Sequence, residues 1–271
     1  MRTKTRLALI AVAFLTGLLF LGWRAARDMG DRARCMNKLK QIGLALHCYQ
    51  ESYDYFPSAA LPNEALPVER RLSWLVALWG FYEAGPVLEI DRTRAWDEGD
   101  NRRLKARYHD KLTGAVSEHE LGTFALVRCP AQRTAGTMAK PSVTDYVGIT
   151  GVDTDSPTLP LDHPRAGFFG YDRCARTADV KDGMSTTIAV AETAWRNGPW
   201  IAAGSATLRS VDRRQRPHVG PGRPFGGLHR GGALVLMVDG SVRFASQSAD
   251  PRVLEALATI AGGEAVPSSE R

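Results

Sequence analysis

His229 and Asp239 are the residues whose types suit acid–base chemistry most directly, and nine residues separate them. A histidine base oriented by a carboxylate requires contact at about 2.6–3.2 Å. If residues 230–238 are largely extended, the two side chains lie about 30 Å apart at about 3.3 Å per residue, which excludes a direct dyad. Asp239-Gly240 between two apolar runs is instead typical of a β-hairpin with a type I′ turn, in which both central residues have positive φ. We therefore expect His229, Asp239 and Gly240 to be structural.

A second Asp-Gly pair, Asp182-Gly183, precedes an apolar run that ends at Glu192. The pair is typical of a turn before a strand. Glu192 offers a carboxylate to a ligand, although hydrogen bonding at a strand end is the favoured interpretation. No Gly-x-Ser-x-Gly elbow, phosphate loop or dinucleotide fingerprint is present, and no metal-ligand spacing accompanies His47 and Cys48. We expect no catalytic site, no metal and no cofactor.

Four cysteines, at positions 35, 48, 129 and 174, are compatible with disulfide bonds in an oxidising compartment. Cys35 and Cys48 are thirteen residues apart on one expected helix, about 20 Å at about 1.5 Å per residue. A disulfide allows only about 4.4–6.8 Å between Cα atoms, so these two do not pair. The residues leave open both remaining full pairings, a single bridge between Cys129 and Cys174, and four reduced thiols.

Residues 7–23 form an uncharged apolar segment of seventeen residues, just long enough to cross a thin hydrocarbon layer at about 1.5 Å per residue. The segment ends in bulky residues rather than a small-x-small cleavage site, which favours a retained anchor over a cleaved signal peptide. Three cations precede the segment and four arginines follow it closely. That charge count alone would keep the large domain in the cytoplasm.

One long helix is expected to continue from this segment into the globular domain. Apolar residues recur at steps of three or four, at positions 29, 33, 36, 39, 42, 46, 49 and 53, which is the spacing of one helix face. The helix should end near Phe56-Pro57, because a residue before proline disfavours helical geometry. The expected organisation is a cytoplasmic tip and transmembrane segment at 1–23, an amphipathic extension at 24–56, a β-rich domain at 57–264 and a flexible tail at 265–271.

The β-rich domain is expected to contain short strands in loop-rich sequence. The pattern predicts strands over residues 123–127, 188–190, 233–238 and 241–245, and helical structure over 72–82. Asp250 should cap a last helix that ends at Gly262. The net charge of +6 is concentrated near the N-terminus and at 209–223, and no binding motif accompanies it, so we expect no nucleic-acid partner.

Six segments in order resemble a large bacterial family of unknown function that has a prepilin-like N-terminus and a C-terminal H-x9-DG box. They are RCMNKLKQIGLALHCYQESYDYFP (34–57), LSWLVALWGFYE (72–83), VRCP (127–130), TDYVGITG (144–151), VKDGMSTTIAVAE (180–192) and FGGLHRGGALVLMVDGSVRF (225–244), followed by TIAGGE (259–264). The resemblance implies an α+β fold like that of type IV pilins and pseudopilins, with a long N-terminal helix packed on an antiparallel sheet. It also implies cysteines at 35 and 129, which favours a Cys35–Cys129 bridge with Cys48–Cys174 as the second.

The family's plan further implies a single-pass inner-membrane protein with a cytoplasmic N-terminus and an extracytoplasmic domain. We expect a non-enzymatic role through protein contacts, with pseudopilin or secretion-system proteins as candidate partners. The alternative is a membrane-tethered ligand-binding or hydrolytic domain, which requires His229, Glu192 and loop carboxylates to converge in one pocket.

The chain departs from the prepilin signal, because Arg6-Leu7 stands where cleavage would need a glycine and residues 7–23 contain no glutamate. The mature protein should therefore keep Met1 or begin within a few residues of it. Intact-mass measurement on membrane-purified protein checks this expectation. A loss of about 23 residues would identify the segment as a cleaved signal instead.

Overall fold

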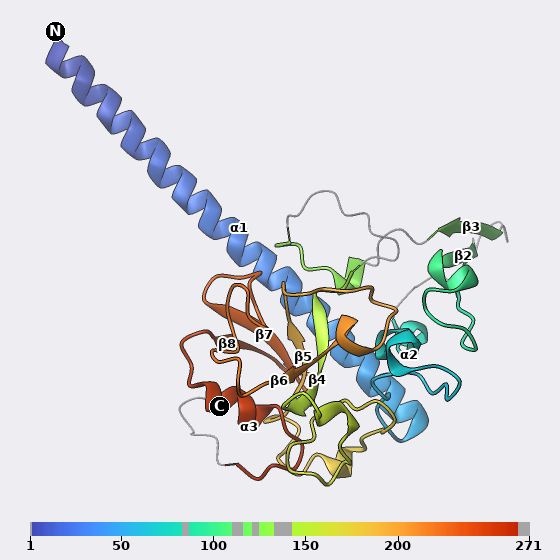
Figure 1. The fold of residues 1–271 in the computed structure, drawn as a ribbon. Coiled ribbons are helices and arrows are strands. Elements are labelled where there is room, and N and C mark those ends of the chain that lie inside the picture. Colours follow the sequence, from blue (N-terminus) through green and yellow to red (C-terminus); the bar gives the residue numbers. More distant parts are fainter. Residues whose placement is uncertain (1, 83–86, 110–115, 121–124, 133–142, 265–271) are drawn as a thin grey trace.

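The longest element is a single helix whose two halves have different surroundings. The computed structural model describes residues 2–82, 87–109, 116–120, 125–132 and 143–264, with the backbone alone at 2–13, 87, 105–109 and 116–120. Helix α1 (Arg2–Tyr53) projects from the globular domain with its N-terminal half and lies against the domain with its C-terminal half (Figure 1). Among the described residues, no helix is both long enough and apolar enough to cross a membrane.

The buried face of α1 is shifted from the face that the apolar spacing predicted. Cys35, Leu39 and Ile42 are fully buried, and they follow one another at helical spacing. Met29, at the predicted start of the face, is 72% exposed, and Tyr53 at its end is 50% exposed. The prediction was wrong at both ends. Near its start the helix buries Asp31, which is 4% exposed, rather than Met29, because the face turned to the domain is rotated from the predicted stripe.

The main sheet has five strands in the order β6-β4-β5-β7-β8. The strands are β4 (Tyr146–Val152), β5 (Ile188–Glu192), β6 (Leu208–Val211), β7 (Gly232–Met237) and β8 (Val242–Ser246). The sheet was expected to be antiparallel throughout, but β4 and β6 pair in parallel. The sheet is therefore mixed, which corrects the antiparallel prediction while keeping the α+β class.

Both faces of this sheet are covered. Leu234 and Leu236 of β7 belong to the apolar cluster under α1, whereas Val235 and Met237 belong to the cluster under helix α3 (Pro251–Leu257). Successive side chains of a strand point to opposite faces, so a strand between two helices must be apolar on both. This explains why β7 is an uninterrupted apolar run.

The remaining elements are short. A separate antiparallel sheet contains β1 (Val87–Glu89), β2 (Lys105–His109) and β3 (Val116–Glu120). The helical prediction over 72–82 corresponds to α2 (Trp74–Ala77) and a 3-10 turn after it. The strand predicted over 123–127 is wrong, since Ala125–Val127 is a 3-10 turn and 123–124 lie outside the described residues, as does the predicted tail.

Asp250 caps α3 as predicted, by accepting a hydrogen bond from the Arg252 N–H at 2.9 Å. The helix ends at Leu257 rather than at Gly262. The predicted end was wrong because the N–H groups beyond the helix bind acceptors outside it. Ile260 donates to the Ala166 carbonyl at 3.0 Å, and Gly262 and Gly263 donate to the Asp182 carboxylate at 2.7 and 2.9 Å.

The hairpin at Asp239-Gly240 is confirmed, but its turn differs from the predicted type I′. Strands β7 and β8 pair antiparallel, with Leu236 opposite Val242. Only Gly240 has a positive φ, of 83°, and its N–H donates to the Met237 carbonyl at 3.0 Å. The loop is thus a three-residue turn with glycine in the left-handed position. Asp239 avoids positive φ and accepts the Ser241 N–H and hydroxyl at 2.8 and 2.6 Å.

Helix α1 lies close to this hairpin at Gly43. A Cβ at that position would lie 3.0 Å from Leu236 Cδ1 and 3.3 Å from Gly240 Cα. Residues of α1 on either side of Gly43 also contact the hairpin. The Arg32 guanidinium lies 3.5 Å from the centroid of the Phe244 ring, and His47 donates to the Val238 carbonyl at 2.9 Å. The helix is therefore seated along the hairpin.

Gly43→Leu should destabilise the protein by about 1–3 kcal/mol, because the added side chain overpacks a site bounded partly by backbone. Gly30→Leu on the same helix is the matched control, since a Cβ at Gly30 meets no described atom within 4 Å. Thermal unfolding in detergent, followed by circular dichroism, compares the two. Equal transition temperatures for both variants would contradict this seating of α1.

Candidate functional site

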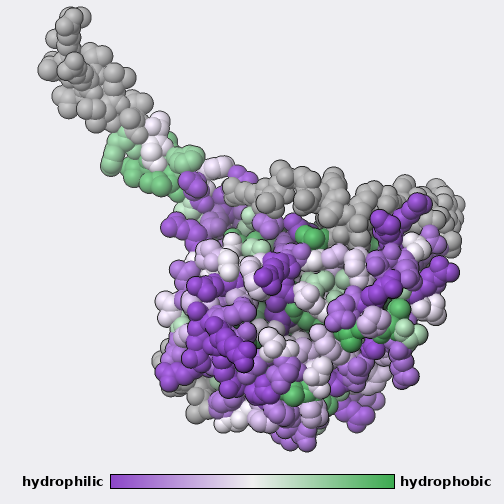
Figure 2. Space-filling model, viewed as in Figure 1, coloured by the Kyte–Doolittle hydropathy of each residue, from purple (hydrophilic) through white to green (hydrophobic). Residues whose placement is uncertain are grey.

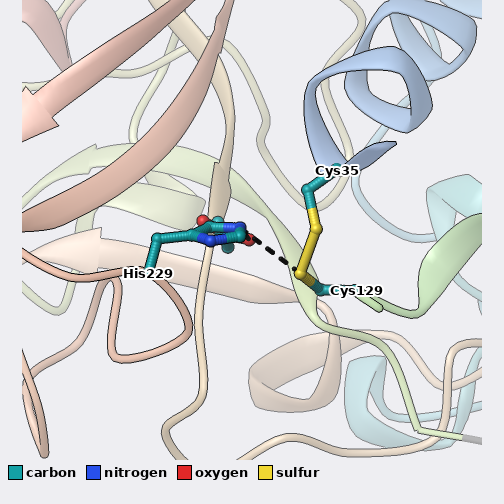
Figure 3. Close-up of side chains that lie close together, drawn as sticks. Cys35, Cys129 and His229 are labelled. Atoms are coloured by element: carbon teal, nitrogen blue, oxygen red, sulfur yellow. Dashed lines mark hydrogen bonds and ion pairs between the residues drawn. A yellow bond between two sulfur atoms is a disulfide. The ribbon is translucent and has the colours of Figure 1, made fainter. Parts of the chain in front are cut away.

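The junction between α1 and the domain is closed by a disulfide bond. Cys35 of α1 and Cys129 are joined with an S–S distance of 2.12 Å and a Cα–Cα distance of 5.5 Å (Figure 3). Both residues are buried. The bridge links positions 94 residues apart, so it ties the long helix to the loop that precedes β4.

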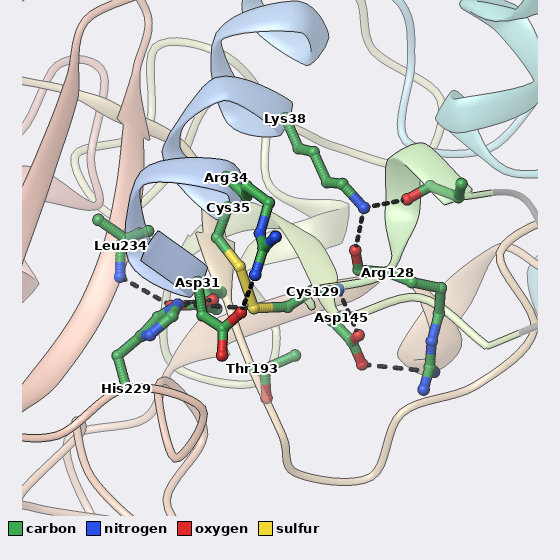
Figure 4. Close-up of a disulfide and its surroundings, with 12 residues drawn as sticks. Asp31, Arg34, Cys35, Lys38, Arg128, Cys129, Asp145, Thr193, His229 and Leu234 are labelled. Carbon is green, nitrogen blue, oxygen red and sulfur yellow. Dashed lines mark hydrogen bonds and ion pairs between the residues drawn. A yellow bond between two sulfur atoms is a disulfide. The ribbon is translucent and has the colours of Figure 1, made fainter. Parts of the chain in front are cut away.

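Lys38 holds the same loop one helical turn further along α1 (Figure 4). Its ammonium donates to the carbonyl of Ala125 and, at 2.6 Å, to the carbonyl of Arg128. Residues three apart on a helix share a face, so Cys35 and Lys38 reach the loop together. Burial lowers the pKa of Lys38, and the charge of Asp145 partly offsets this shift.

Asp145 supports Cys129 from the other side. Its carboxylate accepts the Cys129 N–H at 2.7 Å and an Asn197 side-chain N–H at 2.7 Å, and it lies 3.4 Å from Arg128 Nη1. Burial raises the pKa of Asp145 to about 6, against the opposing effects of Arg128 and these two donors. The carboxyl group is therefore a buried structural element next to the disulfide.

His229 and Glu192 meet beside the disulfide, as the alternative ligand-binding hypothesis required, although they are buried there rather than open to a pocket. His229 Nε2 lies 3.1 Å from Glu192 Oε1 and 3.5 Å from Cys129 Sγ. The His229 side chain is 1% exposed and that of Glu192 is 0% exposed. Figure 3 shows the imidazole directed at the sulfur. The other carboxylate oxygen, Glu192 Oε2, accepts the Leu234 N–H at 3.2 Å, so the expected hydrogen-bonding role of Glu192 at a strand end is confirmed.

The chain brings His229 to Glu192 through the segment that precedes β7. The Gly226 N–H donates to the Glu192 carbonyl at 2.7 Å, which places this segment alongside the end of β5. The backbone then reverses, with Gly231 at a φ of 83° and a bridge between His229 and Gly232. No residue pattern near His229 identifies the distant Glu192 as its partner. The two glycines at 231 and 232 indicate only that the chain bends there.

Asp239 lies outside this cluster. Its carboxylate contacts Ser241 at the hairpin turn, whereas His229 contacts Glu192 and Cys129. The prediction that His229 and Asp239 form no direct dyad is confirmed by these separate contacts. Asp182 is likewise occupied elsewhere, by the residues that follow α3.

The second predicted bridge is wrong, because Cys48 and Cys174 are free thiols. Both are partly buried. The Cys174 sulfur is instead hydrogen-bonded by the backbone and the side chain of Ser58. Burial raises the pKa of the Cys174 thiol.

The cluster of Cys35, Cys129, Glu192 and His229 is the arrangement in the described part of the chain that suits a metal ion. Their ligand atoms all lie within 4.8 Å of one another, and all four residues are buried. The same burial closes the histidine and the carboxylate to a substrate. A cavity of about 530 Å³ lies elsewhere, between the β7–β8 hairpin and α3.

The family to which the chain belongs follows from a comparison with family models. The model of a family described as proteins of unknown function, DUF1559, matches residues 24–203 and 196–252. The matched ranges include α1 from residue 24, the main sheet and all four residues of the cluster. The chain belongs to this family. No curated protein and no solved structure matches it.

The raised pKa of Asp145 predicts how stability depends on pH. The native pKa of about 6 exceeds the unfolded value of about 3.9, so the native state holds this proton more tightly. The stabilisation of the native state by the protonated Asp145 is complete below about pH 4 and is lost as the pH rises through about 6. Between these limits, the free energy of unfolding of wild type should fall by up to about 3 kcal/mol more than that of Asp145→Asn.

Denaturant unfolding across this pH range tests the prediction. Arg128→Gln serves as a second variant, because removing the cation should raise the pKa of Asp145 and move the loss to higher pH. Parallel pH curves for wild type and Asp145→Asn would show that the carboxyl group keeps its unfolded pKa.

Proposed function

We propose that the protein is a pseudopilin-like component of the bacterial envelope, anchored in the inner membrane by the start of α1. In this proposal the N-terminus is cytoplasmic, the domain is extracytoplasmic, and the role is binding of other proteins rather than catalysis. The observation that carries the proposal is the division of α1 into a half that is docked on a sheet and a half that projects free of it.

The projecting half supports an anchor by its exposed apolar side chains. Phe14 is 67% exposed and Leu19 is 73% exposed, and Figure 2 shows a hydrophobic band on the helix between its grey tip and the mainly hydrophilic domain. The guanidinium of Arg27 lies 5.3 Å from the centroid of the Trp23 ring. An aromatic and an arginine at the end of an apolar helix are typical of a membrane interface.

The buried disulfide supports an extracytoplasmic domain, because such bonds persist in oxidising compartments. The cations that follow residue 23 favour the opposite orientation. We give the disulfide more weight, since it is part of the junction that holds α1 on the sheet. The burial of His229 and Glu192 supports a binding rather than a hydrolytic role, since the pair offers a substrate no exposed surface.

A second candidate function is ligand binding in the cavity beside α3. Its volume of about 530 Å³ lies within the range of about 300–1,000 Å³ typical of ligand sites. The lining combines apolar Met237 and Leu254 with polar His218 and Arg243. This site does not involve His229 or Glu192, so it differs from the ligand site that the sequence suggested.

Membrane fractionation of two charge variants tests the anchor. Leu18→Arg with Leu19→Arg should release the full-length protein from membranes, because each arginine costs about 2.5–3.5 kcal/mol at the centre of a membrane helix. Leu44→Arg is the matched control, since Leu44 is 56% exposed on the docked half of the same helix. Membrane retention of the double variant, or release of the control, would refute the anchor.

Recovery of partners tests the envelope role. Tagged protein purified from detergent-solubilised membranes should carry pilus or secretion components, and phosphatase fused after Arg271 should be active outside the inner membrane. An inactive fusion together with an active cytoplasmic reporter would refute the orientation. Recovery of the protein alone would favour the ligand-binding candidate.

A further inference from the structure

Four potential metal ligands converge from four separate parts of the chain. Cys35 comes from α1, Cys129 from the loop after Ala125–Val127, Glu192 from the end of β5 and His229 from the segment before β7. Their ligand atoms lie within 4.8 Å of one another. A tetrahedral zinc ion places its ligand atoms about 3.3–3.8 Å apart, so small side-chain shifts would bring these four groups around one ion.

Two polar atoms of the cluster are unsatisfied in the disulfide form. Glu192 Oε1 and His229 Nδ1 are buried and have no hydrogen-bond partner among the described residues. A buried polar atom left unpaired costs about 1–3 kcal/mol. The Leu234 N–H holds Glu192 Oε2, which leaves Oε1 on the side of His229 Nε2, at 3.1 Å. A cation among these groups would bind Glu192 Oε1, which in the disulfide form has no hydrogen-bond donor in the described part of the chain.

We propose that Cys35, Cys129, Glu192 and His229 bind one zinc ion when the two cysteines are reduced. Two thiolates, one imidazole and one carboxylate are all zinc ligands, and together they complete a four-coordinate site. The disulfide and the zinc ion are then alternative ways to close the same junction between α1 and the sheet. This inference is independent of the membrane anchor and applies to the folded domain in either compartment.

The exchange between the two forms balances with a dithiol as reductant. The dithiol supplies two electrons and two protons, which break the Cys35–Cys129 bond and yield two thiols, and it becomes a disulfide itself. Zinc binding then releases the two thiol protons, while the imidazole is neutral and the carboxylate ionised. In the reverse direction a partner disulfide takes up two electrons and two protons to become a dithiol, while the two thiolates form the Cys35–Cys129 bond and release the ion.

Metal analysis of the full-length protein in detergent tests the proposal. Protein purified anaerobically under reducing conditions, equilibrated with zinc and freed of excess metal should hold about one ion per chain. The oxidised protein should hold none. Cobalt(II) in place of zinc should give the thiolate-to-metal charge-transfer band and the strong ligand-field bands of a tetrahedral thiolate site.

Two variants and a control test the ligand set. Cys35→Ser should abolish stoichiometric zinc, and Glu192→Gln should weaken zinc binding by at least about tenfold while leaving both thiolates in place. Cys48→Ser with Cys174→Ser is the matched control, since both cysteines lie outside the cluster, and it should retain one ion. Zinc absent from the reduced wild type, retained by Cys35→Ser, or lost from the control would overturn the proposal.

X-ray absorption of the zinc-loaded wild type provides a test that does not depend on whether a variant folds. The first shell should contain two sulfur atoms and two lighter ligand atoms. A shell with no sulfur, or with four sulfur atoms, would also overturn it. Neither result would bear on the anchor, which the fractionation experiment tests separately.

Discussion

The packing of α1 on the main sheet is the contact on which the rest of the structure depends. Leu39 and Ile42 of the helix bury the same cluster as Leu234 and Leu236 of β7. Burial of a leucine or isoleucine side chain contributes about 1.5–3 kcal/mol, so four such residues outweigh any single hydrogen bond in this junction. Without the helix, one face of the sheet would be bare, and the docked half of α1 would have no apolar surface to cover it.

A disulfide bond and a few hydrogen bonds determine where along the sheet the helix lies. Apolar packing alone is non-directional, whereas the Cys35–Cys129 bond and the Lys38 hydrogen bonds attach α1 to one loop at one register. Asp145 and the Glu192–His229 pair support that loop and its disulfide from within the domain. The residues that looked most suitable for catalysis thus lie where the helix, the loop and the sheet meet. Their position accounts for burial that would be costly without a structural or metal-binding role.

Sequence reasoning predicted the features that depend on local chemistry. The length of α1, the hairpin at Asp239-Gly240 and the Asp250 cap follow from spacing, turn residues and capping residues. The contacts that define the site are non-local, and nothing near His229 in the sequence identifies Glu192 as its partner. The parallel pairing of β4 with β6 was missed for the same reason, since it depends on how distant strands share a sheet.

Non-reducing peptide mapping tests the docking of α1 most directly. The protein is extracted aerobically with free thiols alkylated, digested without reductant and analysed by mass spectrometry. The account predicts one linked peptide that joins Cys35 to Cys129, with Cys48 and Cys174 alkylated. A bridge between Cys35 and Cys48, or between Cys129 and Cys174, would contradict the way that α1 is joined to the sheet.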